Sequence, residues 1–326
     1  MVKKILIIKL GAKGDVVRTL SILPALKKKY PESEIYWLTK QNITDLLQNH
    51  PLISKVLAIP FHTTEKFDIL YNFDIEEEAT KLAKEIKADE KYGFYSDSGY
   101  PTAFNLNAEY YLNTLFDDDL KKTNRKTYQE MMSGAAALPY NKEYCPIYLN
   151  DEDKKFAEDF LENNSINKEK LIGIHMGTGP RWPSKAWSKE KIKEFIIKVK
   201  QLGYEVILFG GPDEINQHAE FLQELEDSNI KVYQNNPYNS NREFAALVNL
   251  CDKIVCSDSL ALHISIALKK PTICLFFCTT PHEIEGYGFL KKIISPMLYD
   301  FFPEKQDQYN EELVNSISVE EVLSAL

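Results

Sequence analysis

Short apolar runs alternate with segments of helical periodicity along most of the chain. In the first half, strand-like apolar runs occupy residues 4–10, 33–39, 54–60, 67–74 and 92–97. Apolar residues recur at helical spacing at 15–30, 42–50, 76–88 and 127–138. Strands that alternate with helices favour βαβ units and a parallel sheet. The first half is therefore predicted to be an α/β domain, with one helix over 15–30 that contains Pro24.

The same alternation resumes after a stretch rich in proline, asparagine and charge at 139–155. The second half has predicted strands at 170–176, 204–211, 230–235, 252–258 and 271–277, and predicted helices at 188–203, 213–227, 241–250 and 259–268. Such a stretch is typical of the crossing between two units. We expect two α/β domains, at 1–150 and 151–326, with ligands bound at the carboxyl ends of their strands.

Composition excludes several classes of protein. The 326 residues carry a net charge of −9, which argues against a general nucleic-acid binder. No apolar stretch approaches the roughly 20 residues that span a membrane, and the apolar run near the start is too short for a signal peptide, so we expect a cytoplasmic protein. The five cysteines show no C-x-x-C spacing, which favours reduced thiols over disulfides or zinc ligands.

Two acidic groups, at 117–119 and near Asp74, resemble carboxylate metal sites. Neither has a supporting histidine or cysteine, which favours solvated loop or strand-end positions. No metal is therefore expected.

Four strand-to-helix connections carry the candidate chemistry. The first, GAKGD at 11–15, places Asp15 where a helix opens. A helix N-terminus favours negative charge, so Asp15 is equally consistent with a plain cap and with a working carboxylate. Neither a dinucleotide-binding fingerprint nor a P-loop is present.

The second connection runs from His175 to the helix expected at 188. Gly177, Thr178 and Gly179 offer free amides and a hydroxyl, and Lys185 stands just before the helix. Amides at a helix N-terminus together with a lysine favour a phosphate site. The alternative is that Ser188 caps the helix while Lys185 is solvated.

The third and fourth connections add acidic groups and an imidazole. Glu214 follows two glycines and suits ribose hydroxyls, although acidic residues are also simply favoured in a first helical turn. Asp258 ends a strand, Ser259 is placed to cap the next helix, and His263 lies one turn in, near Asp258. A single histidine on a helix is more often structural, so the set of four connections matters more than any one.

The ordered motifs resemble glycosyltransferase family 9, the ADP-heptose:lipopolysaccharide heptosyltransferases. The opening stretch from KILIIKLGAKGD to EIYWLT is similar to that family's start, and WPSKAW, FGGPDE and SDSLALHISIALKKPTICLF resemble its later blocks in order and spacing. The resemblance covers nearly the whole chain. It implies a GT-B fold, with two Rossmann-like domains facing across a cleft, and an inverting reaction that needs no metal and no cofactor.

The resemblance also implies residue roles. Asp15 matches the general base, and Lys185 matches the lysine that binds the donor diphosphate. The other implied donor contacts are Thr178, Glu214 at the ribose, Asn239 at the adenine, and Asp258, Ser259 and His263 at the donor sugar and phosphate. The implied donor is ADP-heptose, and the implied acceptor is a glycan or lipid-linked molecule.

The first domain serves the acceptor in such folds. Arg18 and Arg125 are therefore candidate acceptor contacts, with a surface salt bridge as an equal alternative for Arg18. A lipid-linked acceptor would bring the protein into peripheral contact with the inner membrane surface. No nucleic-acid partner is expected.

Two positions depart from the family pattern. Leu260 and Phe277 stand where the family has glycine, and a side chain at either place is expected to narrow the donor site, to change the donor type or to abolish turnover. This leaves two alternatives to a transferase. One is a catalytically silent protein that binds a sugar nucleotide or glycan, and the other is a GT-B nucleotide-sugar epimerase that uses Asp15 and His263 as acid and base.

Overall fold

The chain divides into two compact units. The computed structural model describes residues 2–177, 179 and 181–326. Unit 1 comprises Met1–Tyr148 and His282–Glu285, and unit 2 comprises Leu149–Pro281 and Gly286–Leu326. The short segment His282–Glu285 is tied to unit 1 by a backbone hydrogen bond of 2.9 Å from Tyr128 N to the carbonyl oxygen of Glu283.

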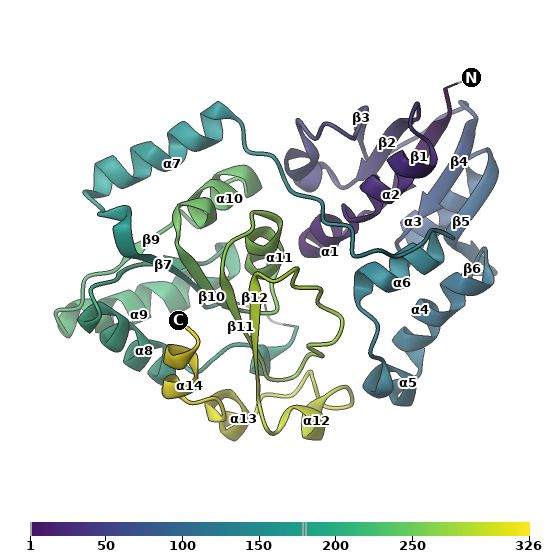
Figure 1. Ribbon diagram of the computed structural model, residues 1–326. Coiled ribbons are helices and arrows are strands. Elements are labelled where there is room, and N and C mark those ends of the chain that lie inside the picture. Colours follow the sequence, from purple (N-terminus) through teal and green to yellow (C-terminus); the bar gives the residue numbers. More distant parts are fainter. Residues whose placement is uncertain (1, 178, 180) are drawn as a thin grey trace. The chain divides into compact units, whose positions relative to one another are not determined.

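Unit 1 is built on a six-stranded sheet (Figure 1). Its strands are β1 (Lys4–Ile8), β2 (Glu34–Thr39), β3 (Lys55–Ala58), β4 (Phe67–Asn72), β5 (Ala88–Asp97) and β6 (Tyr100–Ala103). They lie in the order β3-β2-β1-β4-β5-β6, with β1 to β5 parallel and β6 antiparallel to β5. Residues 5–8 of β1 are completely buried, as expected of a central parallel strand covered on both faces.

The helices of unit 1 cover this sheet. They are α1 (Lys13–Thr19), α2 (Ile22–Lys29), the 3-10 helix η1 (Gln41–Leu47), α3 (Glu77–Glu85), α4 (Leu106–Phe116), α5 (Asp118–Thr123) and α6 (Tyr128–Ala135). Helix α3 packs on β4 and β5, and its Ala79 and Ala83 belong to one core cluster with Leu6 and Ile8 of β1. Helix α6 packs beside α1, α2 and α4.

The single helix expected at 15–30 is wrong, because the chain forms two helices there. Helix α1 ends at Thr19, and α2 begins at Ile22. Pro24 is then the third residue of α2, where a missing N–H is harmless because the first N–H groups of a helix have no partner within it. A continuous helix would need residue 24 to donate to the carbonyl of Leu20, which proline cannot do.

Other elements also differ from the sequence pattern. The helix expected at 42–50 is the 3-10 helix η1, which ends at Leu47, and the strand expected at 230–235 is reduced to β9 (Tyr233–Gln234). Elements β6, α4 and α5 lie in a stretch that showed no clear periodicity. Helix α4 leaves the apolar side chains of Leu106 and Phe116 exposed, so its apolar residues do not form the single stripe that predicts a helix.

Unit 2 is built on a second six-stranded sheet. Its strands are β7 (Leu171–His175), β8 (Glu205–Phe209), β9, β10 (Lys253–Ser257), β11 (Thr272–Phe276) and β12 (Leu290–Ile294). All neighbours are parallel, in the order β12-β11-β10-β7-β8-β9. The chain builds outward from β7 first to β8 and β9 and then, on the other side, to β10. The carboxyl ends of β7 and β10 therefore form the switch point where ligands of such sheets bind.

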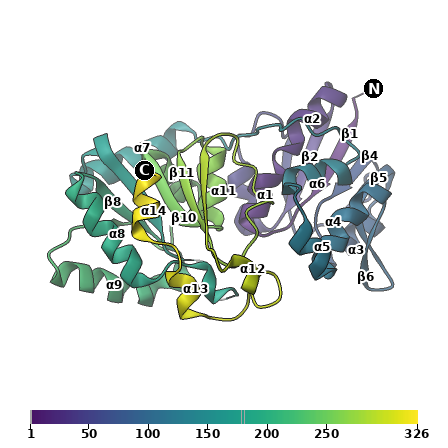
Figure 2. The ribbon, with the colours of Figure 1, turned by 60° about the horizontal axis from the view of Figure 1, so that its bottom comes forward.

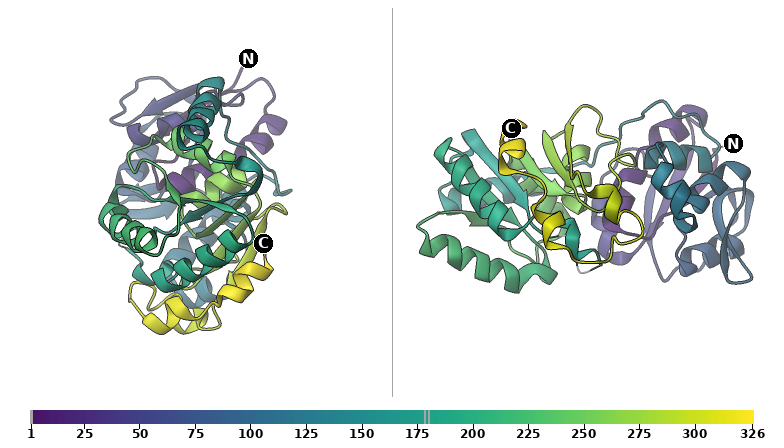
Figure 3. Two further views of the ribbon diagram at one scale, coloured as in Figure 1. Left: turned by 90° about the vertical axis from the view of Figure 1, so that its left-hand side faces the viewer. Right: turned by 90° about the horizontal axis from the view of Figure 1, so that it is seen from below.

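Helices lie on both faces of the unit 2 sheet (Figures 2 and 3). They are α7 (Asp151–Asn164), η2 (Lys168–Lys170), η3 (Pro183–Lys185), α8 (Lys189–Gln201), η4 (Pro212–Glu214), α9 (Ile215–Asp227), α10 (Asn241–Leu250), α11 (Leu260–Ala267), α12 (Leu298–Phe301), α13 (Glu311–Asn315) and α14 (Val319–Ser324). Helices α8 and α14 pack together over one core cluster that includes Phe195 and Val322. Helix α10 packs against α7 and α11.

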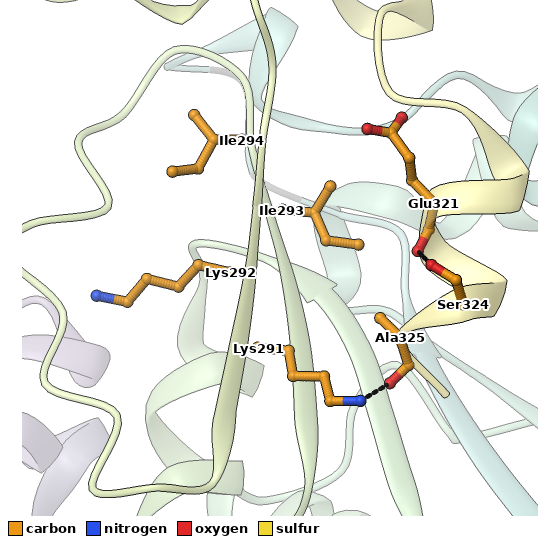
Figure 4. A pocket seen from close by; sticks show the side chains of 7 residues that line it. All are labelled: Lys291, Lys292, Ile293, Ile294, Glu321, Ser324 and Ala325. Atoms are coloured by element: carbon orange, nitrogen blue, oxygen red, sulfur yellow. Dashed lines mark hydrogen bonds between the residues drawn. The ribbon is translucent and has the colours of Figure 1, made fainter.

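An open groove lies between β12 and α14 (Figure 4). It is lined by Lys291, Lys292, Ile293, Ile294, Glu321, Ser324 and Ala325. The ammonium of Lys291 donates to the carbonyl oxygen of Ala325 at 2.6 Å, so this cation serves to hold the end of the chain. The groove contains none of the site residues expected from the sequence. Within the described part of the chain, no helix has the length and apolar character needed to cross a bilayer.

Candidate active site

Asp15 sits in the first turn of α1, directly after the connection that leaves β1. Its Oδ2 accepts a hydrogen bond of 3.3 Å from the backbone N–H of Ala12, and its Oδ1 lies 2.9 Å from a guanidinium nitrogen of Arg18. About 31% of its side chain remains exposed. Asp15 therefore caps the helix and still presents a carboxylate to solvent, so the structure is compatible with both interpretations from the sequence.

Arg18 forms an ion pair with the carboxylate of Asp15 and stacks on an aromatic ring. Its guanidinium carbon lies 3.6 Å from the ring centroid of Tyr128, whose hydroxyl is 2.8 Å from Thr19 Oγ1. Burial alone would lower the pKa of Arg18, but the nearby acidic groups, Asp15 first among them, raise it above its usual value. A salt bridge is thus observed, but the Arg18 side chain is only 14% exposed, so the pair is not the surface salt bridge expected. Contact of Arg18 with an acceptor stays a prediction.

Arg125 lies between α5 and α6 and is exposed. Its Nη1 donates to the carbonyl oxygens of Lys122 and Asn124, at 3.0 and 2.9 Å. These bonds close the last turn of α5, where carbonyl groups lack partners within the helix. Its role at an acceptor also stays a prediction.

Lys185 ends the 3-10 helix η3 of unit 2, and only 7% of it is exposed. Its ammonium lies 3.3 Å from Oδ2 of Asp258 and 4.8 Å from the ring centroid of Trp182. The expectation that Lys185 is solvated is therefore wrong. Ser188 does cap α8, because its hydroxyl accepts from Lys191 N at 3.3 Å, so the cap and the buried lysine coexist.

Asp258 joins Lys185 to His263. The Nε2 of His263 lies 3.7 Å from Oδ1 of Asp258, which confirms that the residue after β10 and the first turn of α11 meet. His263 is 9% exposed. The structure thus gathers an ammonium, a carboxylate and an imidazole at the carboxyl end of β10.

Ser259 holds the N-cap position of α11 but makes no capping hydrogen bond, so that expectation is wrong. Its hydroxyl lies 3.4 Å from Nδ1 of His175 at the end of β7. Burial first, and then repulsion from His218, lower the pKa of His175 to about 4. His175 is therefore neutral at pH 7, and it links the ends of β7 and β10.

Glu214 lies beside the glycines that end β7 and β8. Its Oε2 accepts from Gly211 N at 2.8 Å. A Cβ added at Gly177 would lie 2.4 Å from the carboxyl carbon of Glu214, so any larger residue there would displace this carboxylate. Glu214 thus closes the loop before α9, as a first-turn acid does, and it also packs against the second connection.

Asn239 lies in the loop before α10. Its amide nitrogen donates to Glu243 at 3.2 Å, while its Oδ1 is buried and has no hydrogen-bond partner among the residues that the structure describes. Neighbouring Asn235, which the sequence pattern did not single out, bonds both the N–H and the carbonyl of Gly210. Thr178, the remaining predicted donor contact, lies outside the described residues.

The two departures from the family pattern differ in their surroundings. Phe277 is 1% exposed and belongs to the core cluster of unit 2, so its side chain points into the core and the expectation that it narrows the site is wrong. Leu260 is the first residue of α11 and is partly buried.

The acidic groups considered for a metal have other partners. Asp117 caps α5 by accepting from Leu120 N at 2.9 Å. Asp74 follows β4 as expected, but it is 2% exposed rather than solvated. In the described ranges no group of three or more histidine, cysteine, aspartate or glutamate side chains is arranged to hold a metal ion.

Comparisons with known proteins agree with these motifs. The model of glycosyltransferase family 9 (heptosyltransferase) matches residues 63–313. Lipopolysaccharide heptosyltransferase 1 of Campylobacter coli is 24% identical over 312 residues, which cover 89% of each protein.

Solved structures show the same architecture over both units. A glycosyltransferase family 9 protein of Veillonella parvula superposes with a TM-score of 0.80 at 19% identity, covering 99% of this chain and 95% of that one. The ADP-heptose lipopolysaccharide heptosyltransferase II of Escherichia coli superposes with a TM-score of 0.72 at 17% identity, covering 99% and 97%. These likenesses confirm the GT-B fold, and the extent of the family match shows that this chain belongs to glycosyltransferase family 9, the heptosyltransferase family.

Proposed function

We propose that this chain is an inverting transferase that moves heptose from ADP-heptose to a glycan or lipid-linked acceptor of the lipopolysaccharide core. Membership of the heptosyltransferase family supports the reaction class, and the names of its relatives support the donor and the acceptor. The observation that carries the proposal is the buried group formed by Lys185, Asp258 and His263 at the switch point of unit 2.

This group suits a nucleoside diphosphate. A nearly buried ammonium that is shared with a single carboxylate can turn to a diphosphate, which brings more negative charge and more acceptor oxygens. In this proposal Lys185 holds the diphosphate, while Asp258, Ser259 and His263 contact the sugar and phosphate. Thr178 is retained as a further contact of the second connection.

The nucleoside would lie over the ends of β8 and β9. Glu214 would accept hydrogen bonds from the ribose hydroxyls. The buried Oδ1 of Asn239, which has no partner within the described ranges, suits the amino group of adenine, a hydrogen-bond donor. A buried acceptor left without a partner is unfavourable, so this atom supports an adenine nucleotide.

Asp15 would act as the general base. It removes the proton from the acceptor hydroxyl as that oxygen forms a bond with the anomeric carbon. The bond from the anomeric carbon to the diphosphate oxygen breaks, and ADP leaves with the electron pair. Lys185 stabilises the charge that develops on the leaving group, so no metal ion is assigned to this step. Attack opposite the leaving group inverts the anomeric configuration.

Unit 1 would serve the acceptor and unit 2 the donor. Arg18 and Arg125 are the proposed acceptor contacts, because both are cations of unit 1 and would suit a carboxylate or phosphate of the acceptor. A lipid-linked acceptor would hold the protein at the cytoplasmic surface of the inner membrane. Co-sedimentation with vesicles that contain the lipid-linked acceptor, compared with vesicles without it, tests this location.

The test of the function is a transfer assay with full-length protein, ADP-heptose and a lipopolysaccharide core that lacks heptose. We expect ADP release and a product whose anomeric configuration, read by NMR coupling constants, is opposite to that of the donor. EDTA should leave the rate unchanged. Tight ADP-heptose binding with no transfer would instead indicate a silent binder, and an altered ADP-sugar without acceptor would indicate an epimerase.

A further inference from the structure

A buried ion pair lies directly behind the carboxylate of Asp15. The ammonium of Lys9, the residue after β1, lies 3.3 Å from Oδ2 of Asp74, and the two side chains are 5% and 3% exposed. The same ammonium lies 3.9 Å from Oδ2 of Asp15. Lys9 therefore stands between two carboxylates, one closed to solvent and one open to it.

Asp74 also builds the connection that carries Asp15. Its Oδ2 accepts from the backbone N–H groups of Leu10 and Gly11, at 2.9 and 3.2 Å. Its Oδ1 accepts from Glu76 N at 3.0 Å. A carboxylate at the end of β4 thus fixes the backbone that leaves β1, and with it the start of α1.

The groups around Lys9 keep its charge in place. Tyr111 of α4 and Tyr128 of α6 face it together with Asp74 and Asp15. Burial alone would lower the pKa of Lys9, but these acidic neighbours outweigh burial and raise it above its usual value. Lys9 is therefore a cation at neutral pH, with Asp74 and Asp15 as its two carboxylate neighbours.

We propose that Lys9, anchored by Asp74, is a positioning residue for Asp15. It works with Arg18, which binds the other carboxylate oxygen, so that the carboxylate is held from two sides and stays ionised until the acceptor hydroxyl arrives. An aimed, ionised carboxylate is what a general base needs. This inference rests on the proposed function, because Lys9 is argued to position the general base of that reaction.

The first test is the variant Lys9→Met, which keeps the length of the side chain and removes its charge. We expect kcat for transfer from ADP-heptose to fall at least tenfold at pH 8 and further at pH 5.5, because Asp15 takes up a proton more readily without the cation. The KM for ADP-heptose should stay within twofold. Lys9→Arg should restore most of kcat.

Lys13→Met is the matched control for charge. Lys13 is the first residue of α1 and makes no ion pair within the described part of the chain. Its loss should leave the ratio of kcat at pH 8 and pH 5.5 as in the wild type. An equal change of that ratio in both variants would show a general effect of net charge and overturn the inference.

Lys9→Met leaves Asp74 buried without a counter-charge and can impair folding. The double variant Lys9→Met/Asp74→Asn therefore separates a loss of stability from a loss of catalysis. It removes both charges and keeps one oxygen at position 74 for Leu10 N and Gly11 N, although the bond from Glu76 N is lost. The thermal midpoint should therefore rise above that of Lys9→Met while kcat stays at least tenfold low. Recovery of kcat together with the midpoint would show that the pair is merely structural. Asp15→Asn is assayed alongside. If Asp15→Asn is active, Asp15 is not the general base and the proposed function itself is contradicted. If Asp15→Asn is inactive while the double variant is fully active, only the role of Lys9 is contradicted.

Discussion

At the scale of single residues, the side chain of Lys185 carries a full charge at a place almost closed to solvent. Such a charge is unfavourable unless a partner compensates it, and here Asp258 is that partner. A surface lysine would lose little by losing its partner. The burial of Lys185 therefore distinguishes it from the exposed lysines, and it supports the proposed role of this ammonium in binding the donor.

We predict that Lys185→Met weakens ADP binding by about 10- to 100-fold, since hydrogen bonds to charged groups contribute about 1.5–3 kcal/mol. AMP, which lacks the second phosphate, should be affected less. Calorimetric titration with ADP and AMP provides the measurement. Lys189→Met removes a partly exposed lysine that lies near Glu220 and is the matched control. Equal loss of ADP and AMP affinity would contradict a diphosphate contact.

At the scale of elements, helix α7 is joined to α10 by a buried ion pair. Arg242 of α10 binds both carboxylate oxygens of Asp153, with an Nε to Oδ1 distance of 3.1 Å. The same carboxylate accepts from Asn150 N at 2.7 Å and so caps α7. One side chain therefore fixes both the start of this helix and its attachment to unit 2.

We predict that Arg242→Met lowers the free energy of unfolding by about 3–5 kcal/mol, because it leaves Asp153 buried without a counter-charge. Lys154→Met is the control on the same helix. It removes an exposed pair with Asp151 and should change stability by less than about 1 kcal/mol. Urea unfolding followed by circular dichroism measures both. Similar small losses in the two variants would show that the buried pair does not attach α7.

Sequence patterns predicted the strands better than the side-chain partnerships. Buried parallel strands such as β1 and β11 are continuous apolar runs, so each is visible by itself. Asp15, Lys185 and Asp258 were also visible, because each stands where a strand meets a helix. The pairing of Lys9 with Asp74 was not, because it joins residues 65 positions apart through a strand order that the sequence does not state.

At the scale of the whole molecule, stability depends on histidines that the fold keeps neutral. His50 is 3% exposed, its Nδ1 accepts from Leu52 N at 3.2 Å, and burial lowers its pKa to about 4. The pKa of His175 is lowered to about 4 as well. In the unfolded chain each histidine has a pKa of about 6.5, so the unfolded state binds protons first as the pH falls.

We predict that stability is full above about pH 6.5 and declines as the pH falls towards 4. For one such histidine the free energy of unfolding should drop by about 2 kcal/mol between pH 7 and pH 5. His50→Gln should remove that share of the decline, although it lowers stability at pH 7. His62→Gln, at an exposed histidine, should follow the wild type. Identical pH dependence of the His50→Gln variant and the wild type would contradict the burial argument.

In the proposed reaction, Asp15 activates the acceptor while the groups around Lys185 hold the donor. The most direct measurement is the transfer rate of Asp15→Asn from ADP-heptose to heptose-free core, taken with its affinity for ADP-heptose. General-base catalysis contributes about 10²- to 10⁴-fold, so we predict a loss of at least 100-fold in rate with donor affinity within twofold of the wild type. A variant that transfers heptose within tenfold of the wild-type rate would contradict the account.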